Sequence, residues 1–169
     1  MLQRKSPAAA SQSLAAFLAK YPKSREARMA YARVLVSEKK LPEARAEFEK
    51  LLAANPNNSD VLYAVGLLAA QLKDYATAEA SLKRLLDTGF RDPNAVRFTL
   101  GQIAEEQKNW KGATDWYLSI QRGEQYLPAR LRPAGVTAKE GRLEEARAFL
   151  RTVNASGEQR VQLLLTEAQ

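Results

Sequence analysis

Residues 41–56 read LPEARAEFEKLLAANP, and residues 75–88 read YATAEASLKRLLDT, so the chain contains one pattern twice. In both stretches three residues precede an alanine, and apolar residues follow that alanine at helical spacing. The two alanines, Ala44 and Ala78, are 34 positions apart, and the pattern returns after further steps of 35 and 33 residues. A period of this length is typical of architectures built from repeated helix pairs.

Each repeat places residues of fixed size at fixed positions around its alanine. Large apolar residues stand four and seven positions after it, on one face of a helix. A small residue stands twelve positions before it, and we expect two helices to approach closely there because no branch at Cβ holds them apart. The alanines are Ala44, Ala78, Ala113 and Ala146, the large residues are Phe48, Leu51, Leu82, Leu85, Tyr117, Ile120, Leu150 and Val153, and the small residues are Ala32, Gly66, Gly101 and Ala134.

A bulky residue three positions before each alanine marks a turn, which we expect that side chain to fill. These residues are Leu41, Tyr75, Trp110 and Leu143. Helix starts are marked by Ser24, which can act as an N-cap, and by Asp92 followed by Pro93. Each repeat is therefore predicted to be a helix, a tight turn and a second helix packed back on the first.

These spacings together resemble the tetratricopeptide repeat family, whose units are antiparallel helix pairs of 34 residues. The resemblance covers essentially the whole chain and is strongest over residues 62–85. It implies an all-α fold, a right-handed superhelical solenoid of about ten helices. Arg28, Arg97 and Arg130 replace the large apolar residue usual near the helix start. Pro133 replaces another apolar residue, so we expect the first helix of the fourth repeat to be kinked or to start late.

We predict one continuous domain with an incomplete repeat at each end, and we expect the chain to belong to a longer array. Its segments are the second helix of a truncated repeat over 1–23, full repeats over 24–57, 58–92, 93–126 and 127–156, and the first helix of a truncated repeat over 157–169. The segments GFRDPNAVRFTLGQIAEE and GEQYLPAR resemble those of uncharacterised proteobacterial repeat proteins made with secretion signals. This resemblance implies a periplasmic or cell-envelope parent protein, and the cytoplasm stays open as an alternative.

The composition excludes several kinds of chemistry. The chain has no cysteine and no histidine, so it has no disulfide, no Cys/His zinc site and no Cys–His or Ser–His catalytic pair. Neighbouring glutamates such as Glu105 and Glu106 point to different faces of a helix and cannot act as a dyad. The sequence has no glycine-rich phosphate loop and no carboxylate cluster on a loop. We therefore expect no enzyme activity, no cofactor and no metal.

The net charge of +7 is concentrated near the start of the chain, where residues 1–50 hold 11 Lys and Arg against 5 Asp and Glu. These charges are dispersed along helical stretches without the aromatic residues or modules of nucleic-acid binding, so we expect no specific nucleic-acid partner. No run of 18 apolar residues occurs, and we expect no membrane insertion by this segment.

The resemblance also implies a concave groove lined by the first helices of the repeats, with a protein or peptide as partner. The strip formed by Met29, Tyr63, Leu67 and Phe98 is apolar and suits an extended peptide or an amphipathic helix. The lysines and asparagines with which some related domains clamp a terminal carboxylate are absent, so that ligand class is not expected. The predicted groove residues are Glu26, Met29, Arg33, Val36, Asp60, Tyr63, Leu67, Ala70, Phe98, Gln102, Glu105 and Leu131.

Other interpretations stay open at this point. The groove residues can simply pack within or between repeats. The stretch RGEQYLPAR over 122–130 is the least helix-like, and it is either a second contact site or, as we favour, an ordinary connection. The chain can be a structural spacer in a longer array, or it can self-associate through the exposed Leu163–Leu164–Leu165 end. Weak polyanion binding by the basic first 50 residues ranks last.

Overall fold

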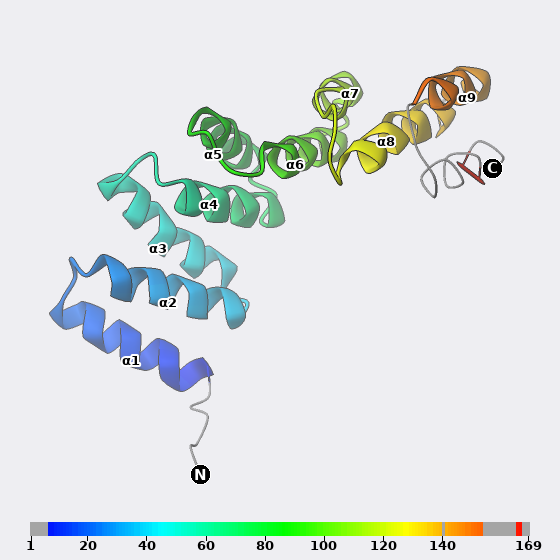
Figure 1. Ribbon diagram of the computed structural model, residues 1–169. Coiled ribbons are helices and arrows are strands. Elements are labelled where there is room, and N and C mark those ends of the chain that lie inside the picture. The colour runs from blue at the N-terminus through cyan, green and yellow to red at the C-terminus, as the bar shows by residue number, and fades with distance from the viewer. Residues whose placement is uncertain (1–6, 140, 154–164, 167–169) are drawn as a thin grey trace, which may run out of the picture. The chain divides into compact units, whose positions relative to one another are not determined.

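The computed structural model describes residues 7–139, 141–153 and 165–166 of the chain (Figure 1). Within these residues the chain forms nine α-helices and no strand, so the predicted all-α class is confirmed. The tenth expected helix, over 157–169, falls almost wholly outside the described residues. The helices are α1 Pro7–Lys20, α2 Arg25–Ser37, α3 Leu41–Ala54, α4 Ser59–Gln71, α5 Tyr75–Asp87, α6 Pro93–Glu106, α7 Trp110–Leu118, α8 Tyr126–Lys139 and α9 Leu143–Thr152.

The chain divides into two compact units, Met1–Phe90 with α1 to α5 and Arg91–Gln169 with α6 to α9. Inside each unit every helix packs against the next one along the chain. The tightest partners are α2 with α3 and α4 with α5 in the first unit, and α6 with α7 and α8 with α9 in the second. Each of these pairs is a helical hairpin closed by a short turn, as the sequence predicts. The assignment of repeat boundaries remains a prediction.

Side-chain caps fix where the helices begin. Ser24 and Asp92 accept hydrogen bonds from the backbone N–H groups of Ala27 and Ala95, which confirms the two predicted caps. Three further helices start in the same way, since one of the four unpaired N–H groups at each helix start must find an acceptor. The residues that supply it are Asn58 before α4, Asp74 before α5 and Asn109 before α7.

The predicted close approach of two helices is found at the small residues. Gly66 of α4 is buried, and a Cβ atom added to it would lie 2.7 Å from the Leu82 side chain of α5. Gly101 of α6 lies against the buried ring of Tyr117 of α7, and a Cβ atom added there would overlap that ring. Glycine is therefore favoured at both crossings, because any larger residue would force the opposite side chain to shift.

The four tight turns have one backbone geometry. Lys39, Lys73, Lys108 and Gly141 stand at the same place in successive turns and all have positive φ, with 59° at each lysine and 80° at the glycine. In each turn two backbone hydrogen bonds return to the last turn of the helix, as in the Schellman motif. In the second turn they run from the Lys73 N–H to the Ala70 carbonyl at 3.0 Å and from the Asp74 N–H to the Ala69 carbonyl at 2.9 Å.

The expectation that a bulky residue fills every turn is partly wrong. Leu41 and Tyr75 are half-buried, but Trp110 and Leu143 are exposed by 42% and 50%. The physical reason is that the turns are closed by their own backbone hydrogen bonds, so no side chain is needed to hold them.

Of the two alternatives expected for the first helix of the fourth repeat, the late start is wrong, while the kink at Pro133 stays a prediction. Helix α8 begins at Tyr126 and continues past Pro133, so it does not start late, and residues 126–130 of the stretch expected to be least helix-like are helical. Pro128 is the third residue of α8, where a backbone N–H has no partner inside the helix, so a proline there removes no hydrogen bond. Pro133 removes only one, and burial of its neighbour Ala134 and of Leu127 offsets that loss.

Gly101→Ala is expected to destabilise the protein by about 1–3 kcal/mol, because the new methyl group must displace the buried Tyr117 ring. Gly135→Ala is the matched control, since no heavy atom lies within 4 Å of the Cβ position at Gly135 of α8. That variant gains helix propensity and should be more stable by about 0.5–1 kcal/mol. Urea unfolding followed by circular dichroism gives both values. Equal stabilisation by the two changes would disprove the tight crossing at Gly101.

Lys73→Gly is expected to stabilise the protein by about 1 kcal/mol, because lysine is strained in the left-handed conformation and glycine is not. Ala80→Gly, at an exposed position of α5, is the control and should cost about 1 kcal/mol. Thermal unfolding compares the two. A loss of stability in Lys73→Gly would mean that contacts of the lysine side chain outweigh the backbone strain.

Candidate functional site

A cavity of about 360 Å³ lies in the first unit between α2 and α4, with α3 behind it. Six of the predicted groove residues line it: Met29, Arg33, Val36, Asp60, Tyr63 and Leu67. Four further residues complete the wall, namely Phe48, Ala64, Leu68 and Gln71. The packing of α2 and α4 on α3 therefore brings together predicted groove residues from two separate helices.

Helical spacing explains why these side chains face one cavity. On α2, Met29, Arg33 and Val36 are separated by four and three residues, which places them on one side of the helix. The same spacing holds on α4 for Tyr63 and Leu67. Phe48 of α3 is buried between the two helices and forms the apolar floor. The Tyr63 ring is held in place by the Phe90 ring, with 5.3 Å between the ring centroids.

Two arginines of α2 differ in what they do. Arg28 pairs with Glu47 of α3 at 2.5 Å and also donates a hydrogen bond to the backbone carbonyl of Pro22. Its guanidinium therefore stabilises the fold. Arg33 is exposed and pairs with no carboxylate in the part of the chain that the structure describes. Asp60, in the first turn of α4, likewise lacks a cationic partner there and is favoured by the helix dipole. The rim of the cavity therefore carries one positive and one negative side chain, and neither forms an ion pair with another described residue.

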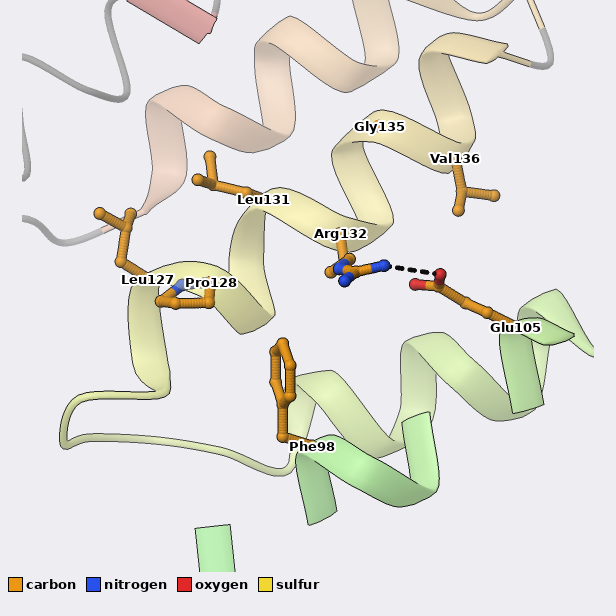
Figure 2. Close-up of a pocket in the computed structure, with 8 residues that line it drawn as sticks. All are labelled: Phe98, Glu105, Leu127, Pro128, Leu131, Arg132, Gly135 and Val136. Carbon is orange, nitrogen blue, oxygen red and sulfur yellow. Dashed lines mark hydrogen bonds and ion pairs between the residues drawn. The ribbon is translucent and has the colours of Figure 1, made fainter. Parts of the chain in front are cut away.

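A second cavity, of about 380 Å³, lies in the other unit between α6 and α8 (Figure 2). Three predicted groove residues line it, namely Phe98, Glu105 and Leu131. Figure 2 shows Arg132 of α8 reaching toward Glu105 of α6, and the two are 3.1 Å apart. The Arg132 guanidinium also lies 5.9 Å from the centre of the Phe98 ring. The charges at this rim are therefore already paired, unlike those of the first cavity. The other lining residues are Leu127, Pro128, Gly135 and Val136.

Glu105 is tied to the core as well as to the cavity. Its Oε1 atom and the hydroxyl of Tyr117 are both buried, and neither has a hydrogen-bond partner among the described residues. Burial raises the pKa of the Tyr117 hydroxyl, and the neighbouring carboxylate of Glu105 raises it further. Tyr117 therefore stays neutral at physiological pH, and its role is to fill the space opposite Gly101.

Not all of the predicted groove residues line a cavity. Glu26 is exposed in the first turn of α2, while Ala70 and Gln102 are half-buried on α4 and α6, and none of the three lines either cavity. Leu131 lines the second cavity but also packs on the buried cluster of Leu127, Ala134 and Leu150 between α8 and α9.

Sequence reasoning missed several lining residues. Ala64 and Gln71 lie on α4 beside the predicted positions, and the helical period around Tyr63 and Leu67 could have indicated them. Arg132 and Val136 belong to α8. Each lies one position after a residue that helical spacing places on the groove side, Leu131 and Gly135, so a wider helical face could have indicated them.

In the stretch 122–130, residues 126–130 serve packing, while residues 122–124 are exposed. Leu127 is buried, and the buried guanidinium of Arg130 donates to the backbone carbonyls of Tyr117 at 3.2 Å and Leu118 at 3.4 Å. The Tyr126 ring lies 5.0 Å from the same guanidinium. These carbonyls are at the end of α7, where helix carbonyls lack internal partners, so Arg130 caps that helix. The contacts favour the interpretation of this stretch as a connection.

In the described part of the chain, no three acidic residues gather as metal ligands would. None of the helices described is both long and apolar enough to cross a lipid bilayer.

Comparison with known proteins places these features in a family. Residues 1–70 and 63–128 match tetratricopeptide repeats. A TPR repeat-containing protein of Pseudomonas aeruginosa is 39% identical over 77 residues, which are 45% of this chain and 13% of that relative, so the chain spans a small part of its length. The crystal structure of MamA has a TM-score of 0.73 at 14% identity, covering 96% of this chain and 91% of MamA. The structure of YrrB, described as a TPR protein with an unusual peptide-binding site, has a TM-score of 0.64 at 18% identity and covers 93% and 81%. At these identities the two structures show the fold alone.

Arg28→Ala is expected to destabilise the protein by about 1–3 kcal/mol, because it leaves the largely buried Glu47 with only the exposed Lys50 as an ionic partner. Arg33→Ala, on the same helix, should change stability by less than about 0.5 kcal/mol. Chemical unfolding of both variants measures the difference. A cost for Arg33→Ala equal to that for Arg28→Ala would show that Arg33 is a structural residue.

The effect of Arg28 should depend on pH. Burial works to raise the pKa of the Glu47 carboxyl, but hydrogen bonds from Lys50 and Arg28 outweigh it, and the pKa lies below its usual value. A lowered pKa stabilises the fold above the usual carboxyl range, and that stability is lost as the pH falls through the lowered value. The gap between the wild-type chain and Arg28→Ala should therefore narrow in acid.

Proposed function

Since the chain belongs to the tetratricopeptide repeat family, we propose that it binds a partner peptide or helix in the cavity between α2 and α4. Repeats of this family generally mediate protein–protein interaction and are typically non-enzymatic scaffolds. The single observation that supports this site is the preformed cavity of about 360 Å³, which is lined mostly by apolar side chains and has unpaired Arg33 and Asp60 at its rim.

The chemistry of the lining defines what binds. Met29, Val36, Tyr63 and Leu67 offer an apolar surface that is already shielded on one side by Phe48, so an aliphatic or aromatic side chain loses water when it enters. Arg33 can then pair with an acidic group of the partner, and Asp60 with a basic group or a backbone N–H. The two charges fix the direction of the bound segment, because they lie on different helices.

Stacked hairpins reduce the cost of binding. The floor and both walls of the cavity come from helices that pack on one another, so little of the protein has to become ordered when the partner binds. The peptide-binding site ascribed to YrrB, a protein of the same fold, supports this kind of function for the chain.

The cavity between α6 and α8 is a weaker candidate. Its rim is bridged by Arg132 and Glu105, and a partner must either leave this pair intact or replace it. Leu131 is also shared with the core on the α9 side, so moving it disturbs packing. The first cavity has neither obstacle.

Tyr63→Ala combined with Leu67→Ala is expected to weaken peptide binding at least tenfold, about 1.4 kcal/mol, because the two side chains form the α4 wall of the cavity. Peptides selected from a displayed random library on the wild-type chain serve as probes, and fluorescence anisotropy measures their affinity. Lys83→Ala, exposed on α5 away from the cavity, is the control and should leave affinity unchanged.

Far-ultraviolet circular dichroism must show the same helix content for all three proteins. Equal binding to the double variant and the wild-type chain would exclude this cavity as the site. Failure to select any binding peptide would favour the structural-spacer interpretation.

A further inference from the structure

The charged residues on the side of the first unit that carries the α2–α4 cavity are separated by sign along the helices. Glu26 and Asp60 are the second residues of α2 and α4, and Arg33 lies two turns further along α2. None of the three forms an ion pair with another residue in the part of the chain that the structure describes. A partner therefore meets carboxylates where these helices begin and a guanidinium nearer to where they end.

The repeat register gives the spacing between these charges. Arg33 stands 34 positions before Leu67, so the two residues occupy equivalent places on α2 and α4. Both helices run antiparallel to α3, because short turns join them to α3 and both pack on it. Asp60 precedes Leu67 by seven residues, which is about 10 Å along the axis at about 1.5 Å per residue. The carboxylate and the guanidinium are therefore anchored about 10 Å apart along the direction of the helices.

Apolar side chains lie between the two charges. Met29 and Tyr63 are equivalent residues of α2 and α4, and each comes three positions after the acidic residue of its own helix. Both line the cavity, and Phe48 forms its floor. The volume of about 360 Å³ has room for a few side chains but not for a whole helix. The cavity therefore admits the apolar side chains from one face of a partner.

The spacing of the charges favours a helical partner over an extended one. In an extended segment the side chains on one face recur at every second residue, at about 7 and 13 Å, and neither distance matches about 10 Å. On a helix, residues i and i+7 share a face and are about 10.5 Å apart. Residues i+3 and i+4 lie between them on that same face. One face of a helix can therefore present two charges and an apolar pair to this cavity at once.

We propose that the cavity between α2 and α4 recognises an amphipathic helix of a partner protein with an acidic residue at i, large apolar residues at i+3 and i+4, and a basic residue at i+7. This inference rests on the proposed function and specifies its ligand. The acidic residue pairs with Arg33, the basic residue pairs with Asp60, and the apolar residues enter between Met29 and Tyr63. The partner helix runs antiparallel to α2 and α4, and its own dipole favours both of its charges.

A designed peptide tests the proposal. It is an alanine-based helix held by a hydrocarbon staple, with Glu at i, Leu at i+3 and i+4, and Lys at i+7. Fluorescence anisotropy should show binding to the wild-type chain with a dissociation constant below about 100 μM. A matched peptide with Gln in place of both charges should bind at least tenfold more weakly. A peptide of the same composition with Lys moved to i+5 should bind at least threefold more weakly, because the shift turns that side chain away from the cavity.

Reversal of one charge in the protein locates the contact. Arg33→Glu should weaken binding of the Glu/Lys peptide at least tenfold. The same variant should bind a peptide with Lys at both i and i+7 at least tenfold more tightly than the wild-type chain does, and misfolding cannot produce such a gain. Lys83→Glu, exposed on α5 away from the cavity, changes the net charge by the same amount and should leave both affinities unchanged.

Tyr63→Ala with Leu67→Ala separates this inference from the proposed function. If the double variant loses binding but the charged, neutral and shifted peptides bind the wild-type chain equally, the cavity is the site and the proposed charge pattern is wrong. If the double variant binds the Glu/Lys peptide as well as the wild-type chain does, the cavity is not the site and both proposals fail.

Two further results would overturn the ligand class alone. One is no binding of the Glu/Lys peptide up to about 1 mM while peptides selected from the random library do bind in the cavity. The other is an Arg33→Glu variant that keeps the wild-type preference for the Glu/Lys peptide over the Lys/Lys peptide.

Discussion

The close approach of paired helices at a small residue is the constraint on which the rest of the structure depends. At Gly66 and Gly101 the opposing Leu82 and Tyr117 side chains occupy the space of a missing Cβ. This contact sets the rotation of each helix about its axis, because only one face carries the glycine. Once that face is turned toward the second helix, Tyr63 and Leu67 of α4 must point elsewhere, and they line the cavity facing α2. The shape of the cavity proposed as the binding surface is therefore a consequence of core packing.

The sequence allowed the hairpins and much of the candidate site to be predicted for the same reason. A period near 34 residues sets the helix pairs, and the spacing of three and four residues places Met29, Arg33 and Val36 on one face. Features that depend on contacts made in only one repeat could not be predicted from the repeat pattern. Arg130 stands where a large apolar residue is usual, and the repeat pattern does not show that its guanidinium caps the carbonyls at the end of α7. Trp110 looks like a core residue, but backbone hydrogen bonds already close its turn.

The proline residues also show that the local conformational preference of a residue does not by itself predict where a helix ends. A proline inside a helix usually costs about 3 kcal/mol, which is why the sequence predicts a kink or a late start of the helix that contains Pro133. Helix α8 nevertheless continues, because Leu127 and Ala134 are buried on both sides of that residue and Pro128 occupies the first turn at no cost in hydrogen bonds. Tertiary burial outweighs the local penalty here, and only coordinates reveal how much burial is available.

The two cavities are similar in volume but differ in whether the charged residues at their rims are paired. Each has room for only a few side chains, so apolar burial alone gives either of them little selectivity. In the second cavity, Arg132 is 45% exposed, and its pairing with Glu105 is worth at most about 1 kcal/mol in a solvated setting. A ligand that breaks this pair still has to replace it, because one oxygen of Glu105 is already buried without a partner. In the first cavity Arg33 and Asp60 have no ionic partner among the described residues to be replaced, so a contact with a partner has only their hydration to offset. That difference, rather than cavity volume, is why recognition is assigned to the α2–α4 side.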